Sequence, residues 1–135
     1  MRNVLLLCVS LAIVSTCGSL KTFREELKDT VVAYNDFLRW NEFNKAKNFV
    51  DESVRQEFEA RVQAAKNVKI ADYRILNTDF EAEKGEQIVE VEFDYYTSPT
   101  YLVKTLMDKQ KWSYVYVEKG KEKRWRLMTP IPDFR

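Results

Sequence analysis

The stretch VEVEFDY, residues 89–95, decides the fold because apolar and acidic side chains alternate along it. Successive side chains of a β-strand point to opposite faces of a sheet, so this alternation predicts one buried face and one solvated face. The buried face is expected to carry Val89, Val91, Phe93 and Tyr95, and the solvated face Glu90, Glu92 and Asp94. A strand with one wet face is typical of an antiparallel sheet.

Three further extended segments accompany this strand, at residues 68–80, 101–117 and 124–129. The long segment 101–117 is expected to kink at Asp108–Gln110, and the last one to turn Trp125 and Leu127 inward. Turns between the strands are predicted at Gly85, Pro99 and Gly120. The four strands therefore form a meander in chain order.

Helical periodicity precedes the strands. Thr22–Glu25 reads T-x-x-E, a capping box that starts a helix. An apolar stripe follows at helical spacing: Phe23, Leu27, Val31, Tyr34 and Leu38. A short helix is expected near 46–50, and Asp51 is a suitable N-cap for a third helix with Val54, Phe58, Val62 and Ala65 as its buried edge. Helices followed by a meander predict an α+β fold in which residues 22–135 form one domain, with N-terminal helices packed on a curved four-stranded antiparallel sheet.

The pattern resembles the cystatin-like superfamily, in particular the nuclear-transport-factor-like cone and the short bacterial lipoproteins built on it. The likeness rests on four segments: YNDFLRWNEFNKAKNFVDESVRQEF (34–58), VEFDYYTSPTY (91–101), KQKWSYVYVEKG (109–120) and RWRLMTPIP (124–132). It implies that the concave sheet and the helices enclose a pocket for an apolar ligand. Candidate lining residues are Phe37, Tyr73, Phe93, Tyr95, Trp112 and Trp125. The alternative is that these aromatic side chains simply fill the core.

The first residues have the layout of a secretory signal. Arg2 is followed by an apolar run from Val4 to Val14, which is too short to span a membrane as a stable anchor. Val14-Ser15-Thr16-Cys17 then resembles the bacterial lipoprotein signal, although Thr16 stands where that signal usually has Gly, Ala or Ser. The resemblance implies a signal peptide at residues 1–16, acyl chains such as palmitate on Cys17, and a tether at 17–21. A secreted protein that is cut nearby and carries no lipid is the first alternative, and a cytosolic protein with a buried N-terminal helix is the second.

The cysteine count favours the lipoprotein interpretation. Cys8 lies inside the signal, so Cys17 is the only thiol expected in the mature chain, and lipid would cap it. Gly18 follows where Asp would retain an enteric lipoprotein in the inner membrane, so the resemblance implies the outer membrane, facing the periplasm. The four residues 18–21 reach only about 14 Å when extended. The domain is therefore expected close to the lipid surface of the cell envelope.

Composition excludes several functions. The chain has no histidine, so Ser-His-Asp and Cys-His catalysis are excluded, as is catalytic zinc of the usual His-rich kind. We expect no metal or other cofactor. The formal net charge of +1 argues against nucleic acid as a partner. The oligomeric state stays open.

Charged residues suggest two further hypotheses. Some cone-fold enzymes use a pocket Asp as a base, and Asp94 beside Tyr95 invites that comparison, but the alternation places Asp94 in solvent. Basic residues gather in the last two strands and their turn: Lys104, Lys109, Lys111, Lys119, Lys121, Lys123, Arg124 and Arg126. They are expected either to pair with acidic residues across the sheet or to contact anionic lipid headgroups or peptidoglycan.

Together these observations predict an exported, lipid-anchored envelope protein that acts as a binding module, with no catalytic residues. Its partners would be the membrane, through acyl chains on Cys17, and an envelope protein or a small apolar ligand. The alternative is a small cone-fold enzyme that uses a pocket Asp or Glu without histidine.

Overall fold

A computed structural model describes residues 22–76, 85–117 and 120–135. The predicted signal peptide, Cys17 and its tether lie outside the described residues, because these begin at Thr22. The part of the first predicted strand beyond Leu76 lies outside them as well.

The first and third helices begin where their caps predict, whereas the short second helix begins at Phe43, three residues before the predicted 46–50. Helix α1 (Phe23–Arg39) starts at a complete capping box, in which the Thr22 hydroxyl accepts from the Glu25 amide and the Glu25 carboxylate accepts from the Thr22 amide. Helix α2 (Phe43–Ala46) continues into the 3-10 turn η1 (Lys47–Phe49). Helix α3 (Glu52–Ala64) is capped by Asp51, whose carboxylate accepts from the Ser53 amide at 3.0 Å.

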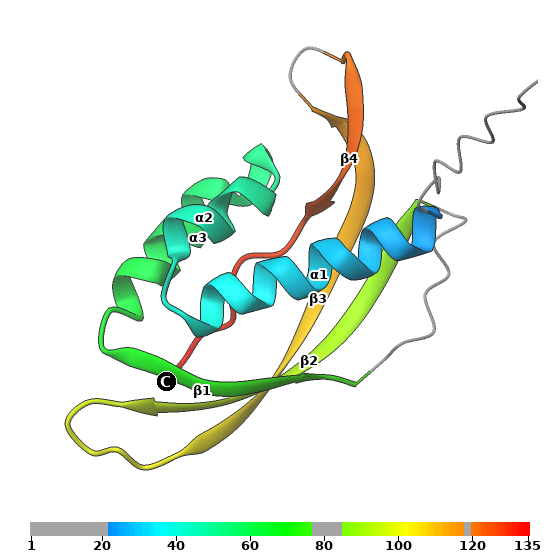
Figure 1. Cartoon of the computed structure of the whole chain (residues 1–135). Helices are drawn as coiled ribbons and strands as arrows, with labels where there is room; N and C mark the ends of the chain where they lie inside the picture. The colour runs from blue at the N-terminus through cyan, green and yellow to red at the C-terminus, as the bar shows by residue number, and fades with distance from the viewer. Residues whose placement is uncertain (1–21, 77–84, 118–119) are drawn as a thin grey trace, which may run out of the picture.

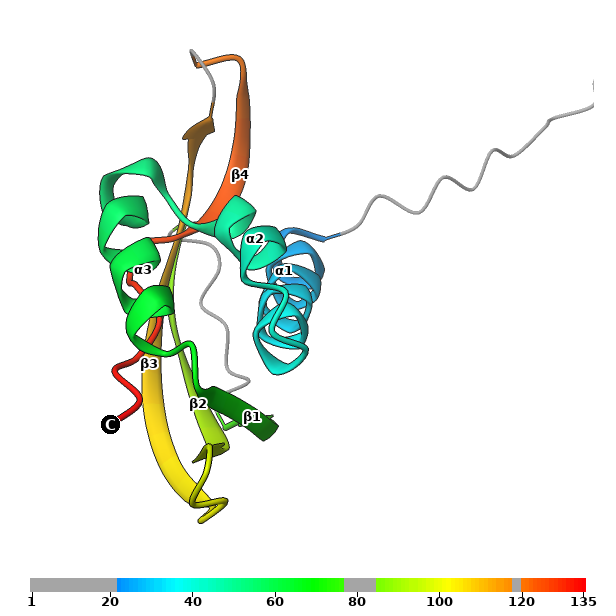
Figure 2. The ribbon, with the colours of Figure 1, turned by 90° about the vertical axis from the view of Figure 1, so that its left-hand side faces the viewer.

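Four antiparallel strands follow in a meander, as predicted. They are β1 (Val68–Ile75), β2 (Glu86–Thr97), β3 (Lys104–Val117) and β4 (Glu122–Leu127), and they pair in the order β1-β2-β3-β4. The sheet curls, and the three α-helices lie inside the curve (Figures 1 and 2). The fold is therefore α+β, with helices packed on a curved four-stranded antiparallel sheet.

The core lies between the helices and the concave face of the sheet. The four inward residues predicted on β2 are buried there with the stripe of α1: Leu27, Val31, Tyr34, Leu38, Val89, Val91, Phe93 and Tyr95. Trp125 and Leu127 of β4 also face inward, as predicted. Phe58 of α3 and Ala65 at its C-cap are buried, whereas Val54 and Val62 of the same helix are only partly covered. The concave face is thus apolar over most of its area.

Two details of the long third strand differ from the prediction. The strand begins at Lys104 rather than Tyr101, which has a positive φ of 52°. The kink expected at Asp108–Gln110 is wrong, because the pairing of β2 with β3 runs without a register shift from Tyr95↔Lys104 to Glu86↔Ser113. The alternation of apolar and polar residues is lost at positions 108–110 because the inward side chains are themselves polar. Hydrogen bonds rather than a bend accommodate these side chains.

The segment after β4 turns back inside the curve. Strand β4 ends at Leu127, two residues earlier than predicted. Ile131 is fully buried, and the Phe134 ring packs against the rings of Phe93 and Tyr95, with centroid distances of 5.9 and 5.0 Å. The Tyr95 hydroxyl donates to the Arg135 carbonyl at 2.9 Å. The C-terminal residues therefore complete the core beside α3.

Candidate functional site

A cluster of polar side chains lies inside the curve of the sheet. Asn35 comes from the buried side of α1, and Asp108 and Gln110 come from β3. The two β3 residues are two positions apart, so both point to the concave face. Asn35 and Gln110 are fully buried and Asp108 is 8% exposed.

The amide of Gln110 uses all of its hydrogen-bonding groups. Its nitrogen donates to Asn35 Oδ1 at 2.7 Å and to Asp108 Oδ2 at 3.3 Å. Its oxygen accepts from Asn35 Nδ2 at 3.2 Å and from Trp112 Nε1 at 3.3 Å. Asn35 also donates to the Val31 carbonyl at 2.8 Å. A buried network that is satisfied in this way fixes how the helix sits on the sheet.

The Asp108 carboxyl is the titratable group of this cluster. Burial raises its pKa from the ordinary 3.8 to about 6, although the hydrogen bond from Gln110 and the charge of Arg61 act in the opposite direction. Desolvation of the Asp108 carboxyl thus outweighs the two contacts that favour its ionised form. A buried carboxyl that titrates near neutral pH is suited to holding or exchanging a proton.

The Tyr34 hydroxyl belongs to the same region. Its ring packs edge-on against Trp112 at a centroid distance of 5.6 Å. The hydroxyl is buried, and among the described residues it has no hydrogen-bond partner. Burial and the nearby Asp108 charge raise its pKa well above the ordinary value, so it stays protonated. It therefore offers a neutral donor close to a carboxyl.

The six aromatic residues predicted to line a pocket are placed in two groups. Phe93, Tyr95, Trp112 and Trp125 are buried in the core, whereas Phe37 and Tyr73 are partly covered at its border. The Tyr73 ring lies 6.3 Å from that of Phe93, but Phe37 packs instead on Phe49 of η1 at 5.9 Å. The structure thus places five of them on the strands and Phe37 on α1 against η1, and an apolar-ligand pocket stays a prediction.

Among the hollows of the described residues, two have a wall that includes an aromatic residue packed at the sheet. One, of about 400 Å³, lies between α3 and the C-terminal segment, where Arg61 and Phe134 contribute to its wall. Arg61 also donates to the Ile131 carbonyl at 2.8 Å and acts electrostatically on Asp108. The other, of about 270 Å³, lies between α1, η1 and β4, where Trp125 contributes. Arg61 therefore links the first hollow electrostatically to Asp108, which is not itself among the residues that line the hollow.

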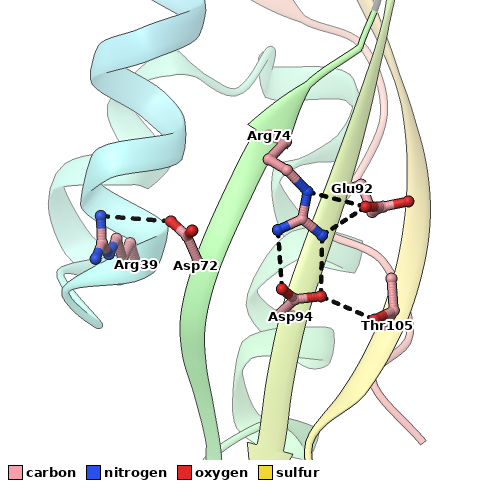
Figure 3. A network of polar contacts seen from close by, with 6 residues as sticks. All are labelled: Arg39, Asp72, Arg74, Glu92, Asp94 and Thr105. Carbon is pink, nitrogen blue, oxygen red and sulfur yellow. Dashed lines mark hydrogen bonds and ion pairs between the residues drawn. The ribbon is translucent and has the colours of Figure 1, made fainter.

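The outer face of the sheet carries a separate charged network (Figure 3). Arg74 of β1 donates to Glu92 at 2.9 Å and to Asp94 at 2.8 Å, and Thr105 donates to Asp94 at 2.8 Å. These hydrogen bonds lower the pKa of the Asp94 carboxyl. The predicted position of Asp94 outside the core is confirmed, and its chemistry there is that of an ion-pair partner.

Several members of the basic cluster pair with acidic residues. Lys109 lies 3.8 Å from Glu90 across the strands, and Lys111 lies 3.8 Å from Glu86. For these two residues the structure agrees with charge pairing on a wet face. Pairs this exposed contribute little to stability.

Sequence reasoning missed Asp108 and Gln110 as inward residues. Counting back from Trp112 in steps of two places both on the concave face. That signal was present, but a carboxyl inside a core is unusual. The Gln110 amide that donates to this carboxyl is itself held by Asn35, which lies in a helix 75 residues away from Gln110.

No group of three or more potential metal ligands of the His, Cys, Asp and Glu types occurs among the residues that the structure describes. Within the same residues, no helix has the length and apolar character needed to cross a membrane. No protein-family model, curated protein or solved structure matches this chain. Its function must therefore be argued from its own residues.

Proposed function

We propose that the chain is an exported protein that acyl chains on Cys17 hold in the cell envelope, where it works as a binding module rather than an enzyme. The observation that carries the proposal is the order of the first residues: a basic Arg2, an apolar run, and Cys17 as the only thiol after it. A basic residue followed by an apolar run is the order of a secretory signal, and Cys17 after Val14-Ser15-Thr16 resembles the lipoprotein signal apart from Thr16. More than one acyl chain gives stable anchoring, whereas a single chain binds marginally.

The start of the folded domain is consistent with a short anchor. The capping box at Thr22 begins α1 five residues after Cys17. The four residues between them can span about 14 Å at most. A domain on such a tether works at the membrane surface, and its partner is expected there too.

Replacement of Cys17 should abolish acylation. Cells that produce the Cys17→Ser chain are expected to incorporate no labelled palmitate into it, because no thiol remains at the processing point. The wild-type chain should be labelled, and part of the label should resist hydroxylamine as an amide-linked acyl group. Gel fluorography after immunoprecipitation measures both.

Cys8→Ser is the matched control, because it removes the other thiol within the expected signal peptide. This variant should be labelled like the wild type. Label that persists in the Cys17→Ser chain, or an unmodified mature N-terminus by mass spectrometry, would contradict the proposal.

A small enzyme is the second candidate function, and the buried Asp108 favours it. The carboxyl, with its pKa raised to about 6, lies in the same region as the neutral Tyr34 hydroxyl. Such a pair can act as a proton acceptor and a hydrogen-bond donor. This candidate needs a substrate that reaches the concave face.

Access to that face can be tested with an apolar anilinonaphthalene dye. A ligand site predicts saturable dye binding that quenches tryptophan fluorescence. Phe134→Ala should strengthen the binding, because the Phe134 ring covers Phe93 and Tyr95. If neither the wild-type chain nor Phe134→Ala binds dye, Asp108 has no substrate site. The binding module then acts through its surface.

A further inference from the structure

The start of α1 is fixed against the β3–β4 end of the sheet. The Phe23 ring packs edge-on against Tyr114 of β3 at a centroid distance of 4.4 Å, and in a tilted orientation against Trp125 of β4 at 4.9 Å. Tyr114 and Trp125 are themselves paired across the strands. The chain that leads from the proposed anchor therefore joins the domain at this end.

The β3–β4 hairpin at this end is basic. Residues 121–126 contain four basic side chains and one acidic one. Glu122 forms an ion pair with Arg124 at 2.9 Å, and Arg126 donates to the Asn48 carbonyl. Lys121 and Lys123 are exposed, and the Lys123 ammonium lies 4.7 Å from the centroid of the exposed Tyr116 ring. An aromatic ring beside lysines is a combination enriched at membrane interfaces.

The opposite end of the sheet has a different character. The β2–β3 loop exposes Tyr101, Leu102 and Val103, and residues 95–103 contain no charged side chain. Lys104, which follows this loop, lies ten positions along β3 from Tyr114, or about 33 Å. This exceeds the roughly 14 Å that the tether can span. Figure 1 shows the two hairpins at opposite ends of β3.

We propose that the β3–β4 hairpin, through Lys121, Lys123 and Tyr116, contacts the anionic phospholipid headgroups of the bilayer that holds the acyl chains. This proposal rests on the proposed anchor at Cys17. Each basic residue near an anionic surface strengthens attraction roughly fivefold. The contact orients the domain with the β2–β3 loop pointing away from the membrane, toward a partner.

The test uses the lipid-anchored protein, purified from membranes and reconstituted into vesicles. Acylation blocks Cys17, so an introduced cysteine is the only thiol that a fluorophore can label. An environment-sensitive fluorophore is placed at Tyr116→Cys on the basic hairpin and, in a second chain, at Leu102→Cys on the opposite loop. Vesicles contain either phosphatidylcholine alone or about 30% phosphatidylglycerol, which supplies the anionic surface.

The probe at Tyr116→Cys should shift to shorter wavelength and brighten only in the anionic vesicles. Salt at about 0.5 M should reverse the change, because it screens charges beyond a few ångström. Adding Lys121→Gln and Lys123→Gln should weaken the response by roughly fivefold per charge. The control pair Lys109→Gln and Lys111→Gln, on the outer face of the sheet, should leave it unchanged.

The remaining outcomes separate the two proposals. A chain that floats with neither kind of vesicle overturns the Cys17 anchor and this inference with it. A chain that floats with both, but whose Tyr116→Cys probe does not respond to anionic lipid, overturns only the hairpin contact. A response at Leu102→Cys instead would show that the opposite end meets the membrane and would also overturn it.

Discussion

Replacing Trp112 with alanine is expected to lower the free energy of unfolding by about 3 to 5 kcal/mol, the usual cost of removing a large buried aromatic ring. The Trp112 side chain is 0% exposed and packs against Tyr34. Its loss would leave a cavity, and the Gln110 oxygen would keep only the hydrogen bond from Asn35. Urea unfolding followed by far-ultraviolet circular dichroism measures the change.

Trp40→Ala is the matched control, because Trp40 is 68% exposed. Truncation at such a surface position typically changes stability by no more than about 0.5 kcal/mol. If Trp112→Ala does not fold, Trp112→Phe keeps a ring in place and should show a smaller loss. A Trp112→Ala loss below about 1 kcal/mol would mean that this side chain lines an open space rather than a packed core.

The second large effect is the pH dependence of stability that Asp108 creates. Its pKa in the folded chain is about 6, above the ordinary 3.8, so the folded state holds the proton more tightly than the unfolded state does. The stability that this proton contributes is complete below about pH 4 and is lost as the pH rises through 6. The expected loss is about 3 kcal/mol. Urea unfolding from pH 4 to 8 measures it.

Asp108→Asn isolates the contribution of this group. The amide has no charge to bury, and its oxygen can still accept the hydrogen bond from Gln110. Relative to the wild type, this variant should therefore gain stability as the pH rises from 4 to 7. Titration of the Asp108 carboxyl carbon by nuclear magnetic resonance reports the pKa directly, and a midpoint near 4 would contradict the prediction.

Asp94→Asn serves as a control of opposite sign. Hydrogen bonds from Arg74 and Thr105 lower the pKa of Asp94, so its contribution is present above the ordinary pKa of 3.8 and lost as the pH falls. Asp94→Asn should be less stable than the wild type at neutral pH, and its stability should approach that of the wild type in acid. If the stability difference from the wild type changed with pH in the same direction for both variants, the prediction that the two carboxyls have different surroundings would be wrong.

The fold was largely predictable because its strongest signals are local. The alternation in 89–95 decides which face of β2 is buried, and the capping box at Thr22 decides where α1 begins. Each signal depends on side chains within a few residues of one another. The meander could be predicted because strands that are consecutive in the sequence usually pair.

The candidate site was less predictable because it depends on contacts between distant residues. The polar residues at Asp108–Gln110 predicted a kink because the groups that accommodate Asp108 depend on distant parts of the sequence. Gln110 is held by Asn35 of α1, and Arg61 comes from α3. Pro130 and Pro132 have no backbone N–H to donate to a strand, but they do not indicate that Phe134 returns to the core. Propensity and periodicity carry no information about such long-range packing.

The charged outer face of the sheet has a consequence for how these molecules behave at high density. No described element covers that face, and curled sheets with bare surfaces can stack on or pair with other copies. Here Arg74 engages Glu92 and Asp94, and Lys109 lies near Glu90, so these charges are already paired within one molecule. Crowded copies would have to strip water from these groups to aggregate, so the protein can stay dispersed where many copies share one surface.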